Sequence, residues 1–341
     1  MTHFPPFKRT AIATACAIAL GLAVLPLSSA HAEQTINIDS PVTHGVAGNS
    51  ARGQAEDGWY TYDVTNVLDP NNNTVNINAD VGGYVFGSVT TNGASASGNT
   101  VNISGGATVA GKTSTSIYRG VRGGYAGNDS MNVTASNNTV NINDAVIEGE
   151  DTEAVWGGFA RSRGHNATAS NNIVNISNAD VTEGVVRGGS ANSNSGTATA
   201  WGNTVNISNA TVNGDVTGGS ATEVGNNTSA PTLNLIASGN TVNISGNAWV
   251  TEDVTGGYAK YGTNRDRVTA TNNTVNISGN ALVDGHVYGG DIRQYATSST
   301  TTAGAGDAFT GNTLNVLNAG MTVGSVQSFE KLNFTFPSTQ T

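Results

Sequence analysis

The chain has 341 residues, only 11 % of them charged, and its formal net charge is −10. Every Asp and Glu lies after residue 32, whereas Lys8 and Arg9 lie before it, so residues 33–341 carry a net charge of −12. Such a surface repels phosphates, which argues against nucleic acid as a partner. The 44 glycines do not indicate disorder, because Val and Ile recur at fixed offsets throughout.

The first 32 residues have the pattern of a secretory signal peptide. A basic pair precedes an apolar run at residues 11–27, and an Ala-x-Ala cleavage motif follows. A membrane anchor is the alternative, but the run contains Gly and Pro and ends in the cleavage motif. We therefore predict cleavage between Ala32 and Glu33 and export of the remainder. Cys16 is the single cysteine, so the exported part has neither disulfides nor thiolate metal sites.

One phrase, Asn-Thr-Val-Asn-Ile, recurs down the chain with small variations. Val and Ile alternate with Thr and Asn, which predicts a short strand with its apolar side chains on one face. We expect the central asparagines to stack as a hydrogen-bonded ladder; the alternative is an exposed row of ligand-binding amides. These asparagines are Asn37, Asn76, Asn102, Asn141, Asn175, Asn206, Asn243, Asn276 and Asn315.

A second phrase, Val-x-Gly-Gly, follows each copy of the first, and an Ala-x-Val pair lies between them. Each unit therefore predicts three strands, and the units predict an all-β fold, a β-solenoid of about nine irregular repeats over residues 33–336. Residues 337–341 form a short tail. The polar stretches after Gly-Gly, such as residues 191–200 and 262–270, are expected to be projecting loops, part of each extending the next strand.

The signal peptide and the tandem N-T-V-N-I and V-x-G-G-Y units resemble the passenger domains of autotransporters (type V secretion), over residues 33–334. The resemblance implies a right-handed β-helix displayed on the surface of a Gram-negative bacterium, often as an adhesin. Autotransporters continue into a C-terminal β-barrel in the outer membrane. This sequence stops at Thr341, so we expect a truncated or split passenger, with the barrel as a separate outer-membrane partner, or a secreted relative.

Several side chains are functional candidates, and none predicts a catalytic, cofactor or metal site. The histidines after the signal peptide are far apart in the repeat order: His44, His165 and His286. Acidic candidates are Asp80 and Asp180 after the first phrase, and a cluster at Glu148, Glu150, Asp151 and Glu153 for which a calcium loop is the alternative to solvated turn residues. Aromatic residues beside the Gly pairs predict a packed ladder or a binding strip: Tyr84, Tyr125, Trp156, Phe159, Tyr258 and Tyr288.

The sequence therefore predicts a protein that presents surface and is not an enzyme. Adhesion is the leading function, through the stretches after Gly-Gly, with a host-cell or matrix protein or carbohydrate, or a second copy, as partner. One alternative is a secreted β-helical carbohydrate-active enzyme, which needs several carboxylates in one groove. Another is a passive spacer or a structural component of a biofilm.

Overall fold

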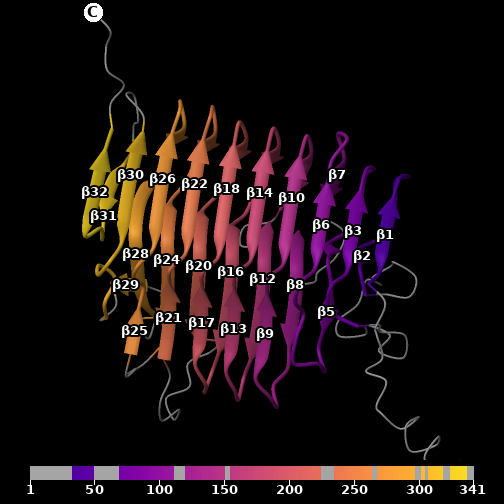
Figure 1. Ribbon diagram of the computed structural model, residues 1–341, viewed down its shortest axis with the longest axis horizontal. Helices are drawn as coiled ribbons and strands as arrows, with labels where there is room; N and C mark the ends of the chain where they lie inside the picture. Colours follow the sequence, from indigo (N-terminus) through magenta and orange to yellow (C-terminus); the bar gives the residue numbers. More distant parts are fainter. Residues whose placement is uncertain are drawn as a thin grey trace, which may run out of the picture. The chain divides into compact units, whose positions relative to one another are not determined.

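The computed structural model describes residues 33–49, 69–110, 120–149, 154–223, 234–262, 267–295, 301–303, 306–317 and 323–335. Within these ranges the chain consists of strands and turns without any helix, and parallel sheets stack as a β-solenoid, which confirms the predicted fold class (Figure 1). These ranges accordingly contain no helix able to cross a membrane. The predicted signal peptide, the acidic residues 150–153 and the tail at 337–341 lie outside them.

The first phrase of every unit builds one parallel sheet of ten strands. All ten are in register, so that each central asparagine pairs with the next. The last strand adds a unit to the nine copies recognised in the sequence. The strands are β1 (Thr35–Ile38), β3 (Thr74–Ile77), β6 (Thr100–Ile103), β10 (Thr139–Asn143), β14 (Ile173–Ser177), β18 (Thr204–Ser208), β22 (Thr241–Ser245), β26 (Thr274–Ser278), β30 (Thr313–Leu317) and β32 (Lys331–Phe334).

The Ala-x-Val and Val-x-Gly-Gly phrases build the second and third sheets. The six-stranded sheet contains β7 (Thr108–Ala110), β11 (Val146–Glu148), β15 (Asp180–Val181), β19 (Thr211–Val212), β23 (Trp249–Val250) and β27 (Leu282–Val283). The eleven-stranded sheet contains β2 (Val46–Ala47), β4 (Val85–Phe86), β5 (Val89–Thr90), β8 (Val121–Gly127), β12 (Val155–Ser162), β16 (Val186–Ser193), β20 (Val216–Glu223), β24 (Val254–Tyr261), β28 (His286–Tyr295), β29 (Thr301–Ala303) and β31 (Ser325–Gln327). Within the described ranges, the strand pairs are parallel except for β28 with β29, which is antiparallel.

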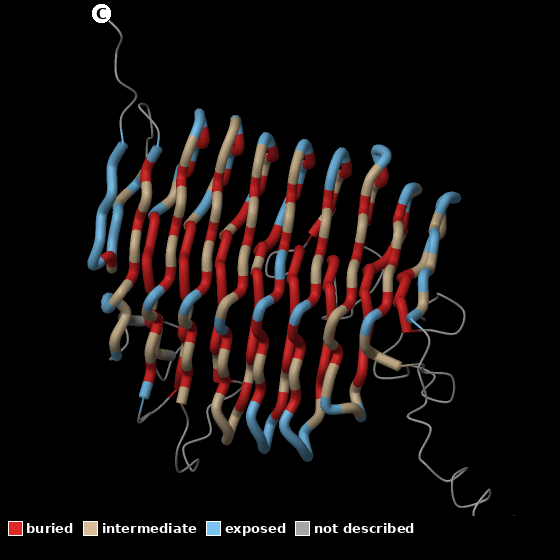
Figure 2. Tube along the Cα trace, in the orientation of Figure 1, coloured by how far each residue is buried: buried red, intermediate tan, exposed pale blue. Residues whose placement is uncertain are grey.

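These three sheets enclose the first hydrophobic core. Alternation places Val and Ile of each first phrase inside, and Val140 and Ile142 are at most 1 % exposed. The first residue of β2, β4, β8, β12, β16, β20 and β24 is a Val that reaches the same core, and in β28 Val287 does so. Figure 2 shows the buried positions aligned from strand to strand. Each coil therefore buries its apolar side chains against the coils before and after it, as stacking of incomplete units requires.

A fourth sheet corrects the prediction of projecting loops after Gly-Gly. The sequence predicted only that part of each loop extends the next strand. Residues 191–200 do not project: Ala191 lies in β16, Ala198 and Ala200 lie in the next strand, and all three are fully buried. Alanines are small enough for two sheets to approach closely, and they form a second core. The five strands are β9 (Val133–Ser136), β13 (Ala167–Ser170), β17 (Ala198–Trp201), β21 (Asn234–Ser238) and β25 (Arg267–Thr269).

The central asparagines form the predicted ladder. The side-chain amide nitrogen of each donates to the side-chain oxygen of its predecessor at 2.6–2.8 Å, from Asn76 onto Asn37 through to Asn333 onto Asn315. The ladder therefore crosses all ten strands. These amides lie on the outer face of the sheet, exposed or partly buried.

A second asparagine ladder, which the sequence analysis missed, lies between the two cores. It uses the first Asn of each phrase, and its members are at most 1 % exposed. The backbone N–H and the side-chain amide of each donate to Oδ1 of the next at 2.9–3.2 Å. The members are Asn73, Asn99, Asn138, Asn172, Asn203, Asn240, Asn273 and Asn312.

This buried ladder explains why Gly-Gly recurs. A Cβ on Gly189 would lie 2.4 Å from Oδ1 of Asn203, and one on Gly188 would lie 2.4 Å from the carbonyl oxygen of Gly218. No side chain fits such an approach, so glycine is required at both places. The two phrases are therefore halves of one contact, although they lie well apart in the sequence.

The residue before each buried Asn is always Asn or Gly, for a backbone reason. All eight adopt a left-handed conformation, with φ between 54° and 72°. Side chains other than those of Gly, Asn and Asp are strained in this region. The positions are Asn72, Gly98, Asn137, Asn171, Gly202, Gly239, Asn272 and Gly311.

Candidate functional site

The outer face of the eleven-stranded sheet carries the side chains that stacking leaves free to vary. In β12, Val155 enters the first core and Ala160 the second, while Trp156, Phe159 and Arg161 lie on the opposite face. In-register partners extend these three positions into columns. The first is Phe86, Arg122, Trp156, Arg187, Thr217, Thr255 and Tyr288; the second is Tyr125, Phe159, Ser190, Ser220, Tyr258 and Asp291; the third is Gly127, Arg161, Asn192, Thr222, Lys260 and Arg293.

Toward the N-terminal end of this face the side chains form a buried aromatic cluster around Arg122. The guanidinium carbon of Arg122 lies 4.6 Å from the ring centroid of Trp156 and 5.3 Å from those of Phe86 and Phe159, and the residue is 1 % exposed. Trp156 and Phe159 pack edge to face at 4.7 Å. Of the aromatic residues proposed from the sequence, Tyr84, Tyr125, Trp156 and Phe159 belong to this cluster, so they pack internally.

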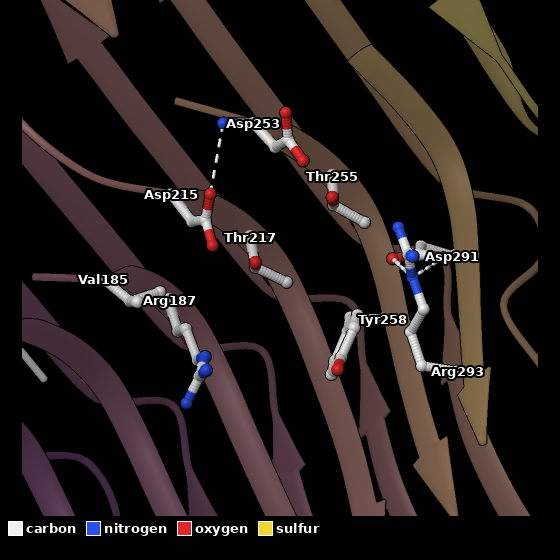
Figure 3. Close-up of a pocket in the computed structure, with 9 residues that line it drawn as sticks. All are labelled: Val185, Arg187, Asp215, Thr217, Asp253, Thr255, Tyr258, Asp291 and Arg293. Carbon is white, nitrogen blue, oxygen red and sulfur yellow. Dashed lines mark hydrogen bonds and ion pairs between the residues drawn. The ribbon is translucent and has the colours of Figure 1, made fainter. Parts of the chain in front are cut away.

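Toward the C-terminal end the same face is hollowed into a polar cleft of about 280 Å³. Its side chains come from β16, β20, β24 and β28 and from the residues just before these strands (Figure 3). The lining residues are Val185, Arg187, Asp215, Thr217, Asp253, Thr255, Tyr258, Asp291 and Arg293. Tyr258 is the member of the predicted aromatic set that lines this cleft.

The carboxylates of the cleft are held in place by neighbouring groups. Oδ1 of Asp215 accepts the backbone N–H of Asp253 at 3.1 Å, and Oδ1 of Asp253 accepts that of His286 at 2.7 Å. Asp291 receives Nε of Arg293 on both of its oxygens at 2.8 Å. The cleft thus presents oriented acceptors beside donors from Arg187, Thr217 and Thr255, which Figure 3 shows on adjacent strands.

Burial perturbs the acidic groups in and beside the cleft. It raises the pKa of Asp215, and the nearby charge of Asp253 raises it further, whereas the backbone hydrogen bond and Arg187 oppose the rise. Burial and the charge of Asp215 likewise raise the pKa of Glu252, which shares a hydrogen bond with Asp215. Burial also raises the pKa of Asp291 despite its Arg partner. Asp215 and Glu252 therefore form a carboxyl pair suited to sharing a proton.

A second, smaller hollow of about 190 Å³ lies on the same face near β8 and β12. An ion pair between Arg163 and Asp129 spans 3.7 Å there, with both side chains 57 % exposed. Arg161 belongs to the column that ends at Arg293 in the larger cleft. The lining residues are Thr91, Tyr125, Gly127, Asn128, Asp129, Arg161 and Arg163.

The other sequence candidates do not come together. His286 accepts or donates a hydrogen bond at Nδ1 with Ser325 at 2.9 Å, and His44 and His165 lie on other coils. Asp80 accepts the backbone N–H of Thr108 at 2.8 Å and is three coils from Asp180 in the register. Among the described residues no group of three or more His, Cys, Asp or Glu side chains could hold a metal ion.

The proposed calcium loop is described only at its first residue. Glu148 ends β11, opposite Ala110, and residues 150–153 lie outside the described ranges. The stretch 262–270 likewise contributes β25 and the buried Ala270, with residues 263–266 outside.

The sequence did carry a signal for the cleft. Asp-Val-Thr-Gly-Gly occurs twice, at residues 215–219 and 253–257, and the register aligns the two copies. In both copies an Asp precedes the Val-x-Gly-Gly strand. Because aligned copies lie on adjacent coils, the repeated phrase predicts two carboxylates side by side. Comparisons with family models, with curated proteins and with solved structures return no match for this chain.

Proposed function

We propose that this chain is an adhesin-like repeat protein displayed on the cell surface or secreted, similar to an autotransporter passenger, and that it binds its partner through the outer face of the eleven-stranded sheet. One observation carries the proposal. Side chains that point into the cores and ladders are nearly the same in every coil, whereas the three outer columns change from coil to coil and form a polar cleft. Positions that packing does not constrain are available for recognition.

Export and display are parts of the same proposal. They rest on the signal-peptide pattern, with cleavage between Ala32 and Glu33. The partner is a host-cell or matrix protein or carbohydrate, or a second copy of this chain, and a separate outer-membrane barrel would anchor it. The binding surface differs from the one that the sequence predicted, because Ala191 and Ala198 of the stretch at 191–200 are built into the second core.

The test is an attachment assay with substitutions borrowed from neighbouring coils. Arg187→Thr, Tyr258→Ser and Arg293→Thr each install the residue that already occupies an in-register position, so the stack should fold. Combined, they should reduce attachment to cells or extracellular matrix. Leu282→Thr, on the exposed face of the six-stranded sheet and in a register that carries Thr211, is the matched control. Unchanged attachment in the triple variant would contradict the proposal.

A carbohydrate-active enzyme is the second candidate, favoured by the raised pKa of Asp215 among the carboxylates of the cleft. A group with a raised pKa can act as a general acid beside an ionised carboxylate. Glycoside hydrolysis uses carboxyls ~5–9.5 Å apart, so the partner would be another carboxylate of the cleft and not the hydrogen-bonded Glu252. The purified chain would then release reducing sugars or unsaturated products from a polysaccharide, and Asp215→Asn would abolish the release. The absence of turnover across a polysaccharide panel would leave binding as the function.

A further inference from the structure

The larger cleft and the smaller hollow share one composition. Each is lined by a tyrosine, an aspartate and an arginine: Tyr258, Asp291 and Arg293 in the first, and Tyr125, Asp129 and Arg161 in the second, where Asp129 follows β8 and the Tyr125 ring packs in the aromatic cluster. The tyrosines occupy the same column, and so do the two arginines. The stack therefore places a tyrosine and an arginine of the same two columns at two places on one face, with an aspartate beside each pair.

The strands between the two sites carry small polar side chains. In the third column β16 carries Asn192 and β20 carries Thr222, both partly exposed, whereas Ser190 and Ser220 of the second column are buried. From β12 to β28 the register advances four strands, which at ~4.8 Å per strand is about 19 Å. A linear ligand lying along the stack would touch both sites and pass over the side chains of Asn192 and Thr222 between them.

The charges of the cleft select against charged polymers. Asp291 and Arg293 pair with each other, and the Asp215 and Asp253 carboxylates repel a polyanion. A polycation would meet the Arg187 guanidinium in the same cleft. Fixed acceptors beside fixed donors suit a neutral ligand whose groups both donate and accept, and an aromatic face suits the C–H side of a ring. Sugar hydroxyls and pyranose faces meet both requirements.

We propose that the outer face of the eleven-stranded sheet binds a neutral, linear oligosaccharide that runs along the stack from the hollow at Arg161 to the cleft at Tyr258. This rests on the proposed binding function and names its ligand class. Binding is distributed, so each site contributes weakly and affinity rises with ligand length until the chain spans both.

The experiment titrates the purified chain with neutral linear oligosaccharides, β-linked and α-linked glucans and xylans from disaccharide to octasaccharide, and with polygalacturonate and a sulfated polysaccharide as charged probes. At least one neutral series should show affinity that increases with length. Tyr258→Ser and Arg161→Asn, which copy Ser220 and Asn192, should each weaken the longest ligand about tenfold. Against a disaccharide, at most one of the two variants should have an effect. Leu282→Thr should leave every affinity unchanged, and thermal melts should show that all variants fold.

Two results would overturn the inference: no binding to any neutral oligosaccharide, or tighter binding of the charged polysaccharides. Failure of the inference can be told apart from failure of the proposed function. If the triple variant loses cell attachment although no neutral oligosaccharide binds, the face is a binding surface for another class of ligand. If attachment also stays unchanged, both proposals fall.

Discussion

Truncation of one buried asparagine, Asn203→Ala, should destabilise the whole stack. Asn203 is fully buried at the centre of the inner ladder. Its Oδ1 accepts the backbone N–H and the side-chain amide of Asn172, at 3.1 and 2.9 Å. Its own amide donates to the carbonyl of Ala169 and to Oδ1 of Asn240, both at 3.0 Å. The substitution removes all four contacts in a region without access to water.

The cost follows from the groups left behind. The backbone N–H of Asn172 and the carbonyl of Ala169 lose these partners, and a buried polar group left unpaired costs ~1–3 kcal/mol. Oδ1 of Asn240 still accepts a hydrogen bond from the backbone N–H of residue 203, so the loss of the side-chain donor costs less free energy there. We expect a decrease in the free energy of unfolding of about 4 kcal/mol, a large share of the ~5–15 kcal/mol typical of a folded domain.

Urea unfolding followed by far-UV circular dichroism measures this loss, with Asn206→Ala as the control. Asn206 belongs to the outer ladder, where its two side-chain bonds of 2.7 and 2.6 Å lie on a partly exposed face. Water can replace these bonds, so the control should lose only ~0.5–1.5 kcal/mol. Equal losses in the two variants, or a loss below ~1 kcal/mol for Asn203→Ala, would refute the reasoning from burial.

Three further predictions concern the backbone, the end of the ladder and pH. Gly239 has φ +66°, so Gly239→Val should lower the free energy of unfolding by ~1–3 kcal/mol in the same assay. Gly239→Asn should be nearly neutral, because asparagines occupy the equivalent positions of other coils. A Val variant as stable as the unchanged protein would contradict this prediction. Asn73 has a buried Oδ1 without a partner, and Gln34 lies opposite it one coil earlier. Gln34→Asn should extend the ladder and add ~1 kcal/mol to stability; an unchanged unfolding midpoint would count against it. Burial raises the pKa of Asp215 above 3.8, so the folded state holds this proton more tightly than the unfolded state does. The stabilisation of the folded state by this proton is therefore full below pH 3.8, and it is lost as the pH rises through the higher pKa of Asp215 in the folded state. Asp215→Asn should flatten the dependence of Tm on pH over that window, and an identical slope in the two proteins would show that another group is responsible.

Much of the fold could be predicted because stacking imposes one demand on every coil. Val140 and Ile142 had to recur, since each covers the same position of its neighbour, and this recurrence is visible in the sequence. The outer asparagine ladder followed from the same register. The fourth sheet was less visible, because Ala-Thr-Ala-Ser at residues 167–170 alternates only between small residues and resembles a polar loop.

The inner ladder depends on contacts that no local pattern contains, and so does the cleft beyond its repeated Asp-Val-Thr-Gly-Gly phrase. Asn203 and Asn206 stand three residues apart in one phrase, yet the first is buried between two cores and the second lies on an outer face. The difference depends on the Gly-Gly strand that packs on Asn203, which belongs to another part of the coil. The cleft likewise joins Arg187 to Asp253 and Asp291 across successive coils, so the irregular spacing between repeats hid their proximity.

Each coil presents the same strand register to the coil before it and to the coil after it. The pairing of neighbouring coils therefore does not fix how many coils the protein contains. One complete coil of the stack spans the 31 positions from Asn175 to Asn206. Strand β14 pairs with β10 on one side and with β18 on the other in the same parallel register. Excision of residues 174–204 would join Ile173 to Val205 and bring together two edges of identical register. Gene-level loss or duplication of such segments can therefore change the reach of the protein in discrete steps without a new fold. In this chain the excised segment would also remove Arg187, so length and recognition are inherited together.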